Sequence, residues 1–588
     1  MNSIKCEFPI TIFNISLYFI LFYSTTSNVI GSVLVLLQLQ LNIPPHDPFS
    51  FHSYLVFPLQ MSAEPETVEQ QQPVDAQPEE VYLDAEGQPM SKAAIKKMKK
   101  MEEIAQKKAE KAAAAALKNA AEEAQRAAAR AQAIEDAKKI VLVEDSSLPA
   151  AKKMNIAEAF KSVGTRVKLT GWVSQLRRQG YMIFIELRDG TGFPNTIQCV
   201  LEGDNAKCYN GMIIAREATV TLYGTIVEAT LNKQKGGVEL KVDFWELHDP
   251  SSTDIENIYN KDTHPDVLLD QRHLVLRESR YIYIMRLRSL LMQCLREHFW
   301  AKDFYEVTPP TIVQNQVEGG STLFKFDYFG SAAYLTQSSQ LYLETCVPVL
   351  GKVFCAMPSF RAEKSRTRRH LSEYTHFEGE MGFITFDDLL DTLEDMVVDV
   401  AERLEKKAGD MLRHINPNFQ VPKRGFRRMN YTDAIEWLRE NKVYKDEETQ
   451  EFYEFGDDIP EAPERKMTDT IGEPIFLCRF PTEMKPFYMY RDPKHPELTE
   501  SVDLLMPGVG EIVGASMRAW DLDVILDGLK KEGIDATSYY WYNDLRKYGS
   551  CPHGGWGLGV ERYICWILGL DHIRDACLYP RFTGRASP

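Results

Sequence analysis

Residues 354–383 read FCAMPSFRAEKSRTRRHLSEYTHFEGEMGF, and this stretch decides the fold of the C-terminal half of the chain. Two strand-like runs flank a loop in which residues 364–370 carry five cations. Arginine binds phosphate through bidentate contacts, so such a loop between two strands indicates an anionic ligand. A loop that is merely solvated is the other interpretation of the same residues.

Two further segments of this half accompany the cationic loop. Residues 287–312 end in FWAKDFYEVTPPTI and predict a helix followed by a strand that stops at Pro309-Pro310. Residues 554–562 read GGWGLGVER and precede a predicted helix, YICWILGL. Their glycines would let the backbone approach a ligand closely. They match neither the GxxxxGK phosphate loop nor the GxGxxG dinucleotide fingerprint, so any ATP chemistry is of another kind.

The region before residue 250 predicts a small barrel. Five short strands in about a hundred residues are typical of the oligonucleotide-binding fold. The predicted strands are Val167–Val173, Tyr181–Leu187, Thr196–Leu201, Ala218–Val227 and Val238–Leu247. Strand alternation places Phe184 and Gln198 on the outer face, where they could stack a base and read its edge. One exposed aromatic residue on a sheet is the simpler interpretation.

The N-terminal segments differ strongly from the rest. Residues 1–60 are apolar and carry one cation, Lys5. They predict an extension of doubtful status ahead of Met61, with a membrane anchor as the alternative. Residues 61–90 predict a disordered acidic tail, and residues 91–150 a Lys/Ala-rich appended helix. One face of this helix carries Lys92, Lys96, Lys100, Lys107 and Lys111. A solvated helix and a stripe that binds nucleic-acid phosphates both fit this spacing.

Length and composition bound the remaining possibilities. The chain has 588 residues, which favours two or three folded domains. Its formal net charge of -16 excludes a wholly basic nucleic-acid coat but leaves room for local basic patches. Its 10 cysteines contain no CxxC pair, so zinc or redox spacing is absent and free thiols in a reducing compartment are expected.

Taken together, FRAE with RHLSEY, the GLGVER segment and the paired prolines resemble the three motifs of class II aminoacyl-tRNA synthetases, in the same order. The preceding barrel resembles that of subclass b, which comprises the aspartyl, asparaginyl and lysyl enzymes. The resemblance covers about residues 154–588 and implies an α+β fold. A five-stranded OB-fold barrel at 151–250 and a hinge at 251–275 would precede a catalytic domain at 276–588, built on an antiparallel sheet with flanking helices.

The resemblance also implies the ligands and the site. ATP is the expected substrate and Mg²⁺ the expected metal, held by Asp503 and Glu511. The residues matching ATP-binding positions are Arg361, Glu363, Arg369, His370, Tyr374, Glu511, Gly559 and Arg562. The α-carboxylate of the amino acid attacks the ATP α-phosphate, so the protein supplies alignment and charge compensation instead of a nucleophile. Pro310 matches the motif at the homodimer interface.

The amino-acid pocket carries the prediction of specificity. The residues matching its positions are Glu318, Gln340, Leu343, Glu344, Glu378 and Arg518. Aspartyl enzymes have a lysine where this chain has Leu343, followed by Glu344. An aspartate side chain would lack compensation there, whereas an amide could accept from Arg518 and donate to Glu344. A structural ion pair is the other interpretation of Glu344.

These observations predict activation of asparagine with ATP and its transfer to tRNA(Asn), in the cytoplasm and by a homodimer without membrane attachment. Phe184 and Gln198 would contact the anticodon, and the lysine stripe would contact the tRNA backbone. The alternatives are an aspartyl enzyme, a catalytically silent binding relative and an ATP-dependent asparagine synthetase. The retained phosphate ligands argue against the silent relative, and the barrel argues against the asparagine synthetase. Residues 425–480 carry no pattern that assigns a role.

Overall fold

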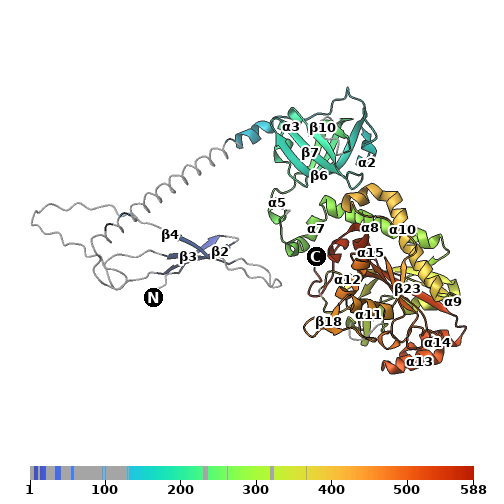
Figure 1. The fold of residues 1–588 in the computed structure, drawn as a ribbon. Helices are drawn as coiled ribbons and strands as arrows, with labels where there is room; N and C mark the ends of the chain where they lie inside the picture. The colour runs from blue at the N-terminus through green and yellow to red at the C-terminus, as the bar shows by residue number, and fades with distance from the viewer. Residues whose placement is uncertain are drawn as a thin grey trace, which may run out of the picture. The chain divides into compact units, whose positions relative to one another are not determined.

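The computed structural model describes residues 131–229, 236–260, 262–317, 323–365 and 367–587 (Figure 1). It also describes Lys96, Lys100, Ala129 and four strands within the first 58 residues. Two compact units divide the chain, residues 1–120 and 121–588.

The described strands of the first unit form one small sheet. Its strands are β1 (Lys5–Ile10), β2 (Phe13–Ile20), β3 (Leu34–Gln40) and β4 (Tyr54–Pro58), each antiparallel to the next. Of the helices in the described part of the chain, none combines the length and apolar character needed to cross a membrane. The predicted acidic tail at 61–90 lies outside the described residues.

A closed barrel begins the second unit, which confirms the predicted five-stranded fold. Its elements are β5 (Lys152–Lys153), α2 (Ile156–Ala159), β6 (Arg166–Gln179), β7 (Met182–Arg188), β8 (Ile197–Leu201), α3 (Asp204–Lys207), α4 (Tyr209–Ile213), β9 (Thr219–Glu228) and β10 (Val238–Asp249). The order is β5-β6-β7-β8-β10-β9, and pairing of β6 with β9 closes the barrel. Alternate apolar residues such as Ile183, Ile185 and Ile197 fill its interior.

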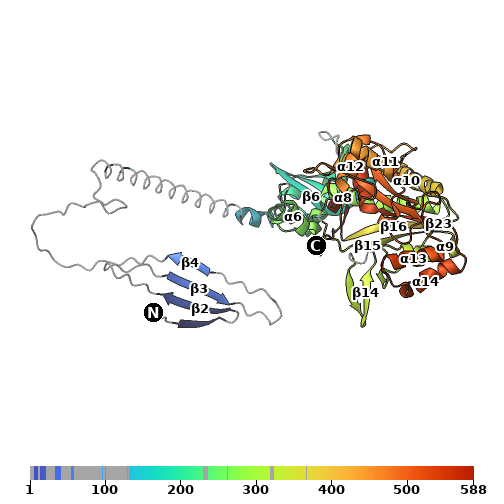
Figure 2. The same cartoon turned by 60° about the horizontal axis from the view of Figure 1, so that its bottom comes forward.

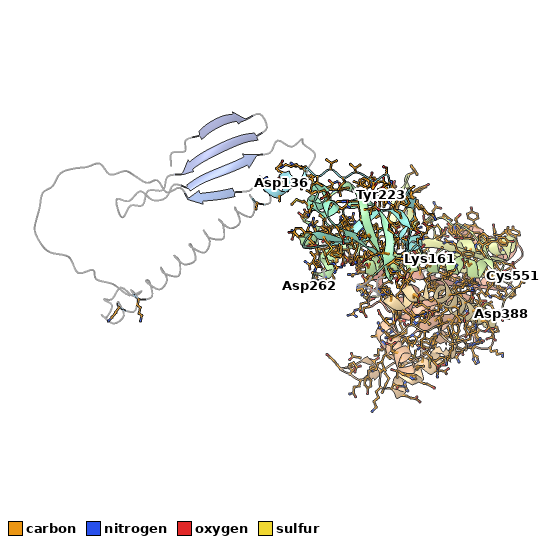
Figure 3. The ribbon with its side chains drawn as sticks, turned by 90° about the horizontal axis from the view of Figure 1, so that it is seen from above. Asp136, Lys161, Tyr223, Asp262, Asp388 and Cys551 are labelled. Carbon is orange, nitrogen blue, oxygen red and sulfur yellow. The ribbon has the colours of Figure 1, made fainter. Side chains whose placement is uncertain are left out.

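The connector after the barrel holds three short helices, α5 (Ile255–Ile258), α6 (Pro265–Asp270) and α7 (Arg272–Val275). Arg272 is buried and donates to the carbonyl oxygens of Cys577 at 2.6 Å and Leu578 at 3.1 Å. These bonds attach the connector to the end of the C-terminal domain. In the side-chain view, Lys161 and Tyr223 mark the barrel, Asp262 the connector, and Asp388 and Cys551 the C-terminal domain (Figure 3).

The C-terminal domain is built on an eight-stranded sheet in the order β11-β15-β16-β23-β22-β21-β20-β17. Its strands are β11 (Tyr305–Glu306), β15 (Lys352–Phe360), β16 (Glu373–Gly382), β17 (Arg427–Asn430), β20 (Ile475–Cys478), β21 (Ser501–Met506), β22 (Gly510–Met517) and β23 (His553–Gly559). The central pairings are antiparallel, and only the edge strands β11 and β17 pair parallel among these described strands. Figure 2 shows β15, β16 and β23 side by side.

Helices and small sheets surround this main sheet. The helices are α8 (Ser279–Trp300), α9 (Gln340–Leu350), α10 (Phe386–Ile415), α11 (Tyr431–Glu440), α12 (Glu461–Ile471), α13 (Leu522–Lys531), α14 (Tyr540–Lys547) and α15 (Val560–Leu568), with 3₁₀ turns η2 (Thr482–Met484), η3 (Ala536–Tyr539) and η4 (Ile573–Ala576). The small sheets are β12 (Ile312–Val313), β13 (Lys325–Tyr328) and β14 (Ser331–Leu335), and β18 (Tyr444–Asp446) with β19 (Glu451–Phe452). Leu291 of α8, Val397 of α10 and Ile564 of α15 belong to the core on one face of the sheet.

Candidate active site

A cavity of about 430 Å³ lies on the face of the sheet that the core helices leave open. Alternation along β16 explains its position. Tyr374, His376, Glu378 and Glu380 line the cavity, whereas Phe377 packs into the core. The predicted residues that line this cavity are Gln340, Leu343, Arg361, Glu363, Arg369, His370, Tyr374, Glu378, Asp503, Glu511, Arg518, Gly559 and Arg562. Segments more than 200 residues apart in the sequence, such as those of Gln340 and Arg562, therefore meet at one site.

The glycines of β23 make room for the side chains of β16. A Cβ atom at Gly555 would lie 2.0 Å from Glu380 Oε2, and one at Gly557 would lie 2.2 Å from His376 Nε2. Only glycine tolerates such close approach in a central strand. The glycine-rich residues therefore form strand β23, which pairs with β16 and β22 and forms the floor of the cavity. Helix α15 begins directly after this strand.

Cationic side chains form the end of the cavity that the sequence assigns to phosphate. The Arg361 guanidinium lies 5.7 Å from the ring centroid of Tyr374. Arg562 donates from Nη1 to the backbone oxygen of Glu511 at 3.0 Å and to its Oε2 at 2.9 Å. Burial lowers the pKa of His370, and the nearby Arg562 lowers it further. This end can therefore neutralise several negative charges.

Helix α12 holds Arg369 at the same end, which the sequence did not indicate. Arg369 Nη1 lies 2.9 Å from Glu464 Oε1, and Arg369 Nε lies 3.2 Å from Glu461 Oε2. Glu464 Oε1 also accepts the backbone N–H of Glu511 at 3.2 Å. Burial raises the pKa of Glu464 to about 7, although Arg369 opposes the shift. Acidic residues in a helical first turn are usually solvated, so nothing in residues 425–480 pointed to this contact.

Two buried carboxylates converge beside these cations. The Cβ position at Gly514 would lie 3.7 Å from Asp503 Oδ1 and 3.5 Å from Glu511 Oε1. Burial raises the pKa of Asp503 to about 6, and Lys485, 3.3 Å away, opposes the shift. Burial acts in the same direction on Glu511, but Arg562 and two further arginines outweigh it and lower its pKa to about 2.

The converging carboxylates fit a hard divalent cation, which prefers oxygen ligands. Within the described ranges, no group of three or more His, Cys, Asp or Glu side chains is arranged to hold a metal ion. A cation at Asp503 and Glu511 would therefore complete its coordination with substrate oxygens and water. This donor set is typical of Mg²⁺, which retains several of its waters in protein sites.

At the other end of the cavity, Arg518 and Glu380 form a buried pair. Arg518 donates from Nε and Nη2 to the two Glu380 carboxylate oxygens, each at 3.0 Å. Its Nη1 donates to Ser516 Oγ at 2.7 Å. Glu380 is 0% exposed and was not among the predicted residues. Alternation along β16 gives Glu378 and Glu380 the same face, but it does not say which of them meets Arg518.

Glu344, in contrast, lies behind the cavity and does not line it. It accepts from Arg546 Nη2 at 2.6 Å, Tyr542 Oη at 2.9 Å and Gln340 Nε2 at 3.1 Å, and its Oε2 lies 3.1 Å from His553 Nε2. Burial would raise the pKa of Glu344, but Arg546 and His553 outweigh it and lower the pKa. Its geometry is that of an internal ion pair, the alternative weighed for it from the sequence.

Two other residues predicted for the amino-acid pocket, Glu378 and Leu343, line the cavity, unlike Glu344. Glu378 accepts the Ser339 backbone N–H at 2.9 Å and a hydrogen bond from the Ser338 hydroxyl, which fixes it at the start of α9. Leu343 is fully buried in the same helix. Glu318, expected at the substrate ammonium group, lies outside the described residues.

The predicted nucleic-acid contacts lie on other surfaces. Phe184 and Gln198 are half-buried on the outer face of neighbouring strands, where Phe184 pairs with Val200 and Gln198 pairs with Glu186. Gln198 also donates to Glu239 Oε2 at 2.8 Å.

In the lysine stripe, Lys96 and Lys100 are helical and exposed. Lys92, Lys107 and Lys111 lie outside the described residues. Pro310, predicted at an interface between copies, is exposed in the segment between β11 and β12.

Comparison with known proteins adds the family relationships. Residues 264–583 match the family described as "tRNA synthetases class II (D, K and N)", residues 167–247 the "OB-fold nucleic acid binding domain", and residues 60–149 the "Asparaginal-tRNA synthetase, N-terminal domain". The chain is 53% identical over 519 residues to the cytoplasmic asparagine–tRNA ligase of Bos taurus, covering 88% of this chain and 90% of that protein. The corresponding Saccharomyces cerevisiae protein is 50% identical over 511 residues, covering 86% and 91%. The solved structure of Entamoeba histolytica asparaginyl-tRNA synthetase in complex with asparaginyl-adenylate is similar with a TM-score of 0.70 at 44% identity, covering 75% of this chain and 100% of that one.

Proposed function

The chain belongs to the asparagine–tRNA ligases of the class II aminoacyl-tRNA synthetases, and from that premise we propose how its own residues activate asparagine and transfer it to tRNA(Asn). The proposal depends on one observation above all. A single cavity joins a cationic end, with Arg361 and Arg562, to a buried Arg518–Glu380 pair. The cationic end suits a triphosphate, and the buried pair suits a side-chain amide.

In the activation step, the asparagine α-carboxylate attacks the α-phosphorus of ATP and pyrophosphate leaves. Arg361 contacts the α-phosphate, and Tyr374 stacks on the adenine ring. His370 and Arg562 contact the outer phosphates, and a phosphate beside His370 would oppose the lowering of its pKa by burial. Because these groups are already positioned before the reaction, they stabilise the anionic transition state without reorganising. Glu363 and Gly559 complete the nucleotide end of the cavity.

Asp503 and Glu511 would hold a magnesium ion at this end. Bound Mg²⁺ would neutralise part of the phosphate charge while pyrophosphate departs. Glu511 is fixed for this task by two hydrogen bonds from Arg562, and Lys485 positions Asp503. Without a cation, two converging buried carboxylates repel each other, which is consistent with the raised pKa of Asp503.

Arg518 and Glu380 would read the asparagine side chain. An amide presents one acceptor and one donor, so its oxygen can accept from Arg518 while its NH₂ donates to Glu380. An aspartate carboxylate would instead face the Glu380 charge in a buried site, where like charges are poorly compensated. This assignment replaces Glu344, whose oxygens are occupied by Arg546 and its neighbours. Gln340, Glu378 and Glu318 remain proposed for the substrate's ammonium end.

The barrel would bind the anticodon. Phe184 offers a ring for base stacking, and Gln198 offers donor and acceptor groups beside it. The lysine stripe would contact the tRNA backbone without reading its sequence. These relatives are named as cytoplasmic enzymes, and we infer the same compartment for this chain.

A homodimer is proposed from an apolar groove along α8. Met285, Met292 and Leu578 line this groove together with Trp300, whose exposed fraction is 64%. A large exposed aromatic residue in such a groove is typical of an interface. Pro310 lies ten residues further along the chain, after β11.

The decisive experiment is ATP–pyrophosphate exchange by the full-length chain with asparagine or aspartate as the only amino acid. Exchange with asparagine alone, followed by charging of tRNA(Asn), is expected. Equal exchange with aspartate would contradict the proposal that Arg518 and Glu380 recognise the side-chain amide, but it would not contradict the synthetase chemistry. Absence of exchange from a folded protein that binds ATP would contradict the proposal as a whole. An Arg361→Ala variant, expected to be inactive, serves as the control.

A further inference from the structure

A second cavity, of about 600 Å³, lies beside the first and has no role in the steps above. Helix α12, the chain after α10, the turn at residues 507–509 and the end of α15 enclose it. Arg369, Arg562 and Ile573 line both cavities. The two spaces therefore share a wall at the end where the outer phosphates of ATP are proposed to lie.

The second cavity is cationic beyond this shared wall. Arg368 and Arg465 line it in addition to the two shared arginines. Two carboxylates, Glu461 and Asp571, also line it, so arginines outnumber carboxylates by four to two. Arg369 is already bound by α12, and Arg562 is bound by Glu511. Among the described residues, the ion-pair contact of Arg465 is the longer one with Asp469, at 3.4 Å. The least neutralised of these three arginines, Arg465, thus lines the second cavity and not the first.

We propose that this second cavity is the exit path for the pyrophosphate produced by asparagine activation. The inference rests on the proposed function. In that step, an oxygen of the asparagine carboxylate bonds to the α-phosphorus, and the bond from this phosphorus to the bridging oxygen breaks. The electron pair leaves with pyrophosphate, at the end of the first cavity that Arg369 and Arg562 share with the second. Successive arginines then offer the anion bidentate contacts on its way out.

The arrangement also explains why α12 binds Arg369. Glu461 and Glu464 hold this guanidinium in the shared wall, at 3.2 and 2.9 Å. A cation that is partly neutralised retains pyrophosphate less tightly than a free one, so the anion can move on to Arg465. The nucleoside half of the substrate stays behind, because the adenylate is held by Tyr374 and Arg361 in the first cavity.

The test uses pyrophosphate binding as its readout in the full-length protein. The variant Arg465→Ala removes a cation from the second cavity only. Its neighbour Lys466 is exposed and does not line the cavity, so Lys466→Ala is the matched control for loss of one positive charge on α12. KM for pyrophosphate is measured in asparagine-dependent exchange, and KM for ATP in aminoacylation.

For Arg465→Ala, KM for pyrophosphate should rise about tenfold, the usual effect of one charge-assisted contact, with KM for ATP unchanged. Lys466→Ala should change neither value. An unchanged KM for pyrophosphate in Arg465→Ala, with normal exchange by the wild type, would overturn the exit path and leave the proposed function intact. An equal rise in both KM values would also overturn it, since Arg465 would then act on ATP itself.

A second variant blocks the path sterically. Asn418 is exposed and lines the second cavity, so Asn418→Trp fills space there without disturbing the core. Burst kinetics of pyrophosphate release should show chemistry at the normal rate and release slowed at least fivefold. Release at the wild-type rate would show that pyrophosphate leaves through the opening used by ATP.

Discussion

The specificity of the amino-acid pocket can be tested by the substitution Glu380→Gln. The side chains of Glu380 and Arg518 are 1% and 4% exposed and share two hydrogen bonds of 3.0 Å. Glutamine preserves the volume and one acceptor but removes the charge. An asparagine substrate then loses a charged acceptor for its NH₂ group, and an aspartate substrate no longer meets a like charge.

The two effects have opposite signs and can be estimated. Loss of a hydrogen bond to a charged group costs about 1.5–3 kcal/mol, which lowers kcat/KM for asparagine about 10- to 150-fold. An uncompensated buried charge costs about 3–5 kcal/mol, and the variant removes part of this penalty for aspartate. Discrimination between the two amino acids should therefore fall by about a thousandfold.

The assay is ATP–pyrophosphate exchange with each amino acid, and Glu344→Gln is the matched control. Glu344 is equally buried but faces Arg546 and His553 behind the cavity. Its replacement should lower the melting temperature and leave the discrimination unchanged. If Glu380→Gln kept wild-type discrimination while Glu344→Gln admitted aspartate, the assignment of the amide contact to Glu380 would be refuted.

Three further outcomes are expected. Gly557→Ala places a methyl group 2.2 Å from His376 Nε2 and should reduce exchange activity more than tenfold, in a protein that circular dichroism shows to be folded. Trp300→Glu should convert a dimer to a monomer in light scattering, whereas Val349→Glu, at another exposed apolar residue, should not. Glu464→Gln should remove a pH dependence. The pKa of Glu464 is about 7 in the folded protein, against 4.5 for the free group, so its protonated form stabilises the wild type. This contribution to the free energy of unfolding, about 3 kcal/mol at most, is complete below pH 4.5 and is lost as the pH rises through 7. Urea unfolding at several pH values measures it.

Local sequence patterns predicted the strands in which apolar and polar residues alternate regularly. The barrel strands and the strands on either side of the cationic loop follow period-two alternation, so their faces could be assigned from the residues. Phe184 and Gln198 were placed on one outer face in this way, and their positions in β7 and β8 agree with it. The ATP-binding residues came from motif resemblance, and those described lie around one cavity.

Contacts between distant segments could not be predicted in this way. Arg518 meets Glu380 across 138 residues, and Arg546 meets Glu344 across 202. Glu380 lies on a predicted strand and Glu344 on helix α9, but the choice of arginine partner depends on how β22, β23 and α14 pack. The pairing of Arg369 with α12 depends on tertiary structure for the same reason, since α12 alone reads as a solvated helix.

The overall charge of this protein is negative, whereas the phosphate end of its main cavity is cationic. A formal net charge of -16 repels tRNA and ATP at long range. Salt screens that repulsion beyond about 8–10 Å, whereas contacts inside a cavity are screened far less. Arg361 and Arg562 lie within the cavity, so their attraction acts where the global repulsion has faded. Binding of the anionic substrate should therefore depend on these half-buried arginines more than on the acidic surface, and their removal should cost more than any change in surface charge.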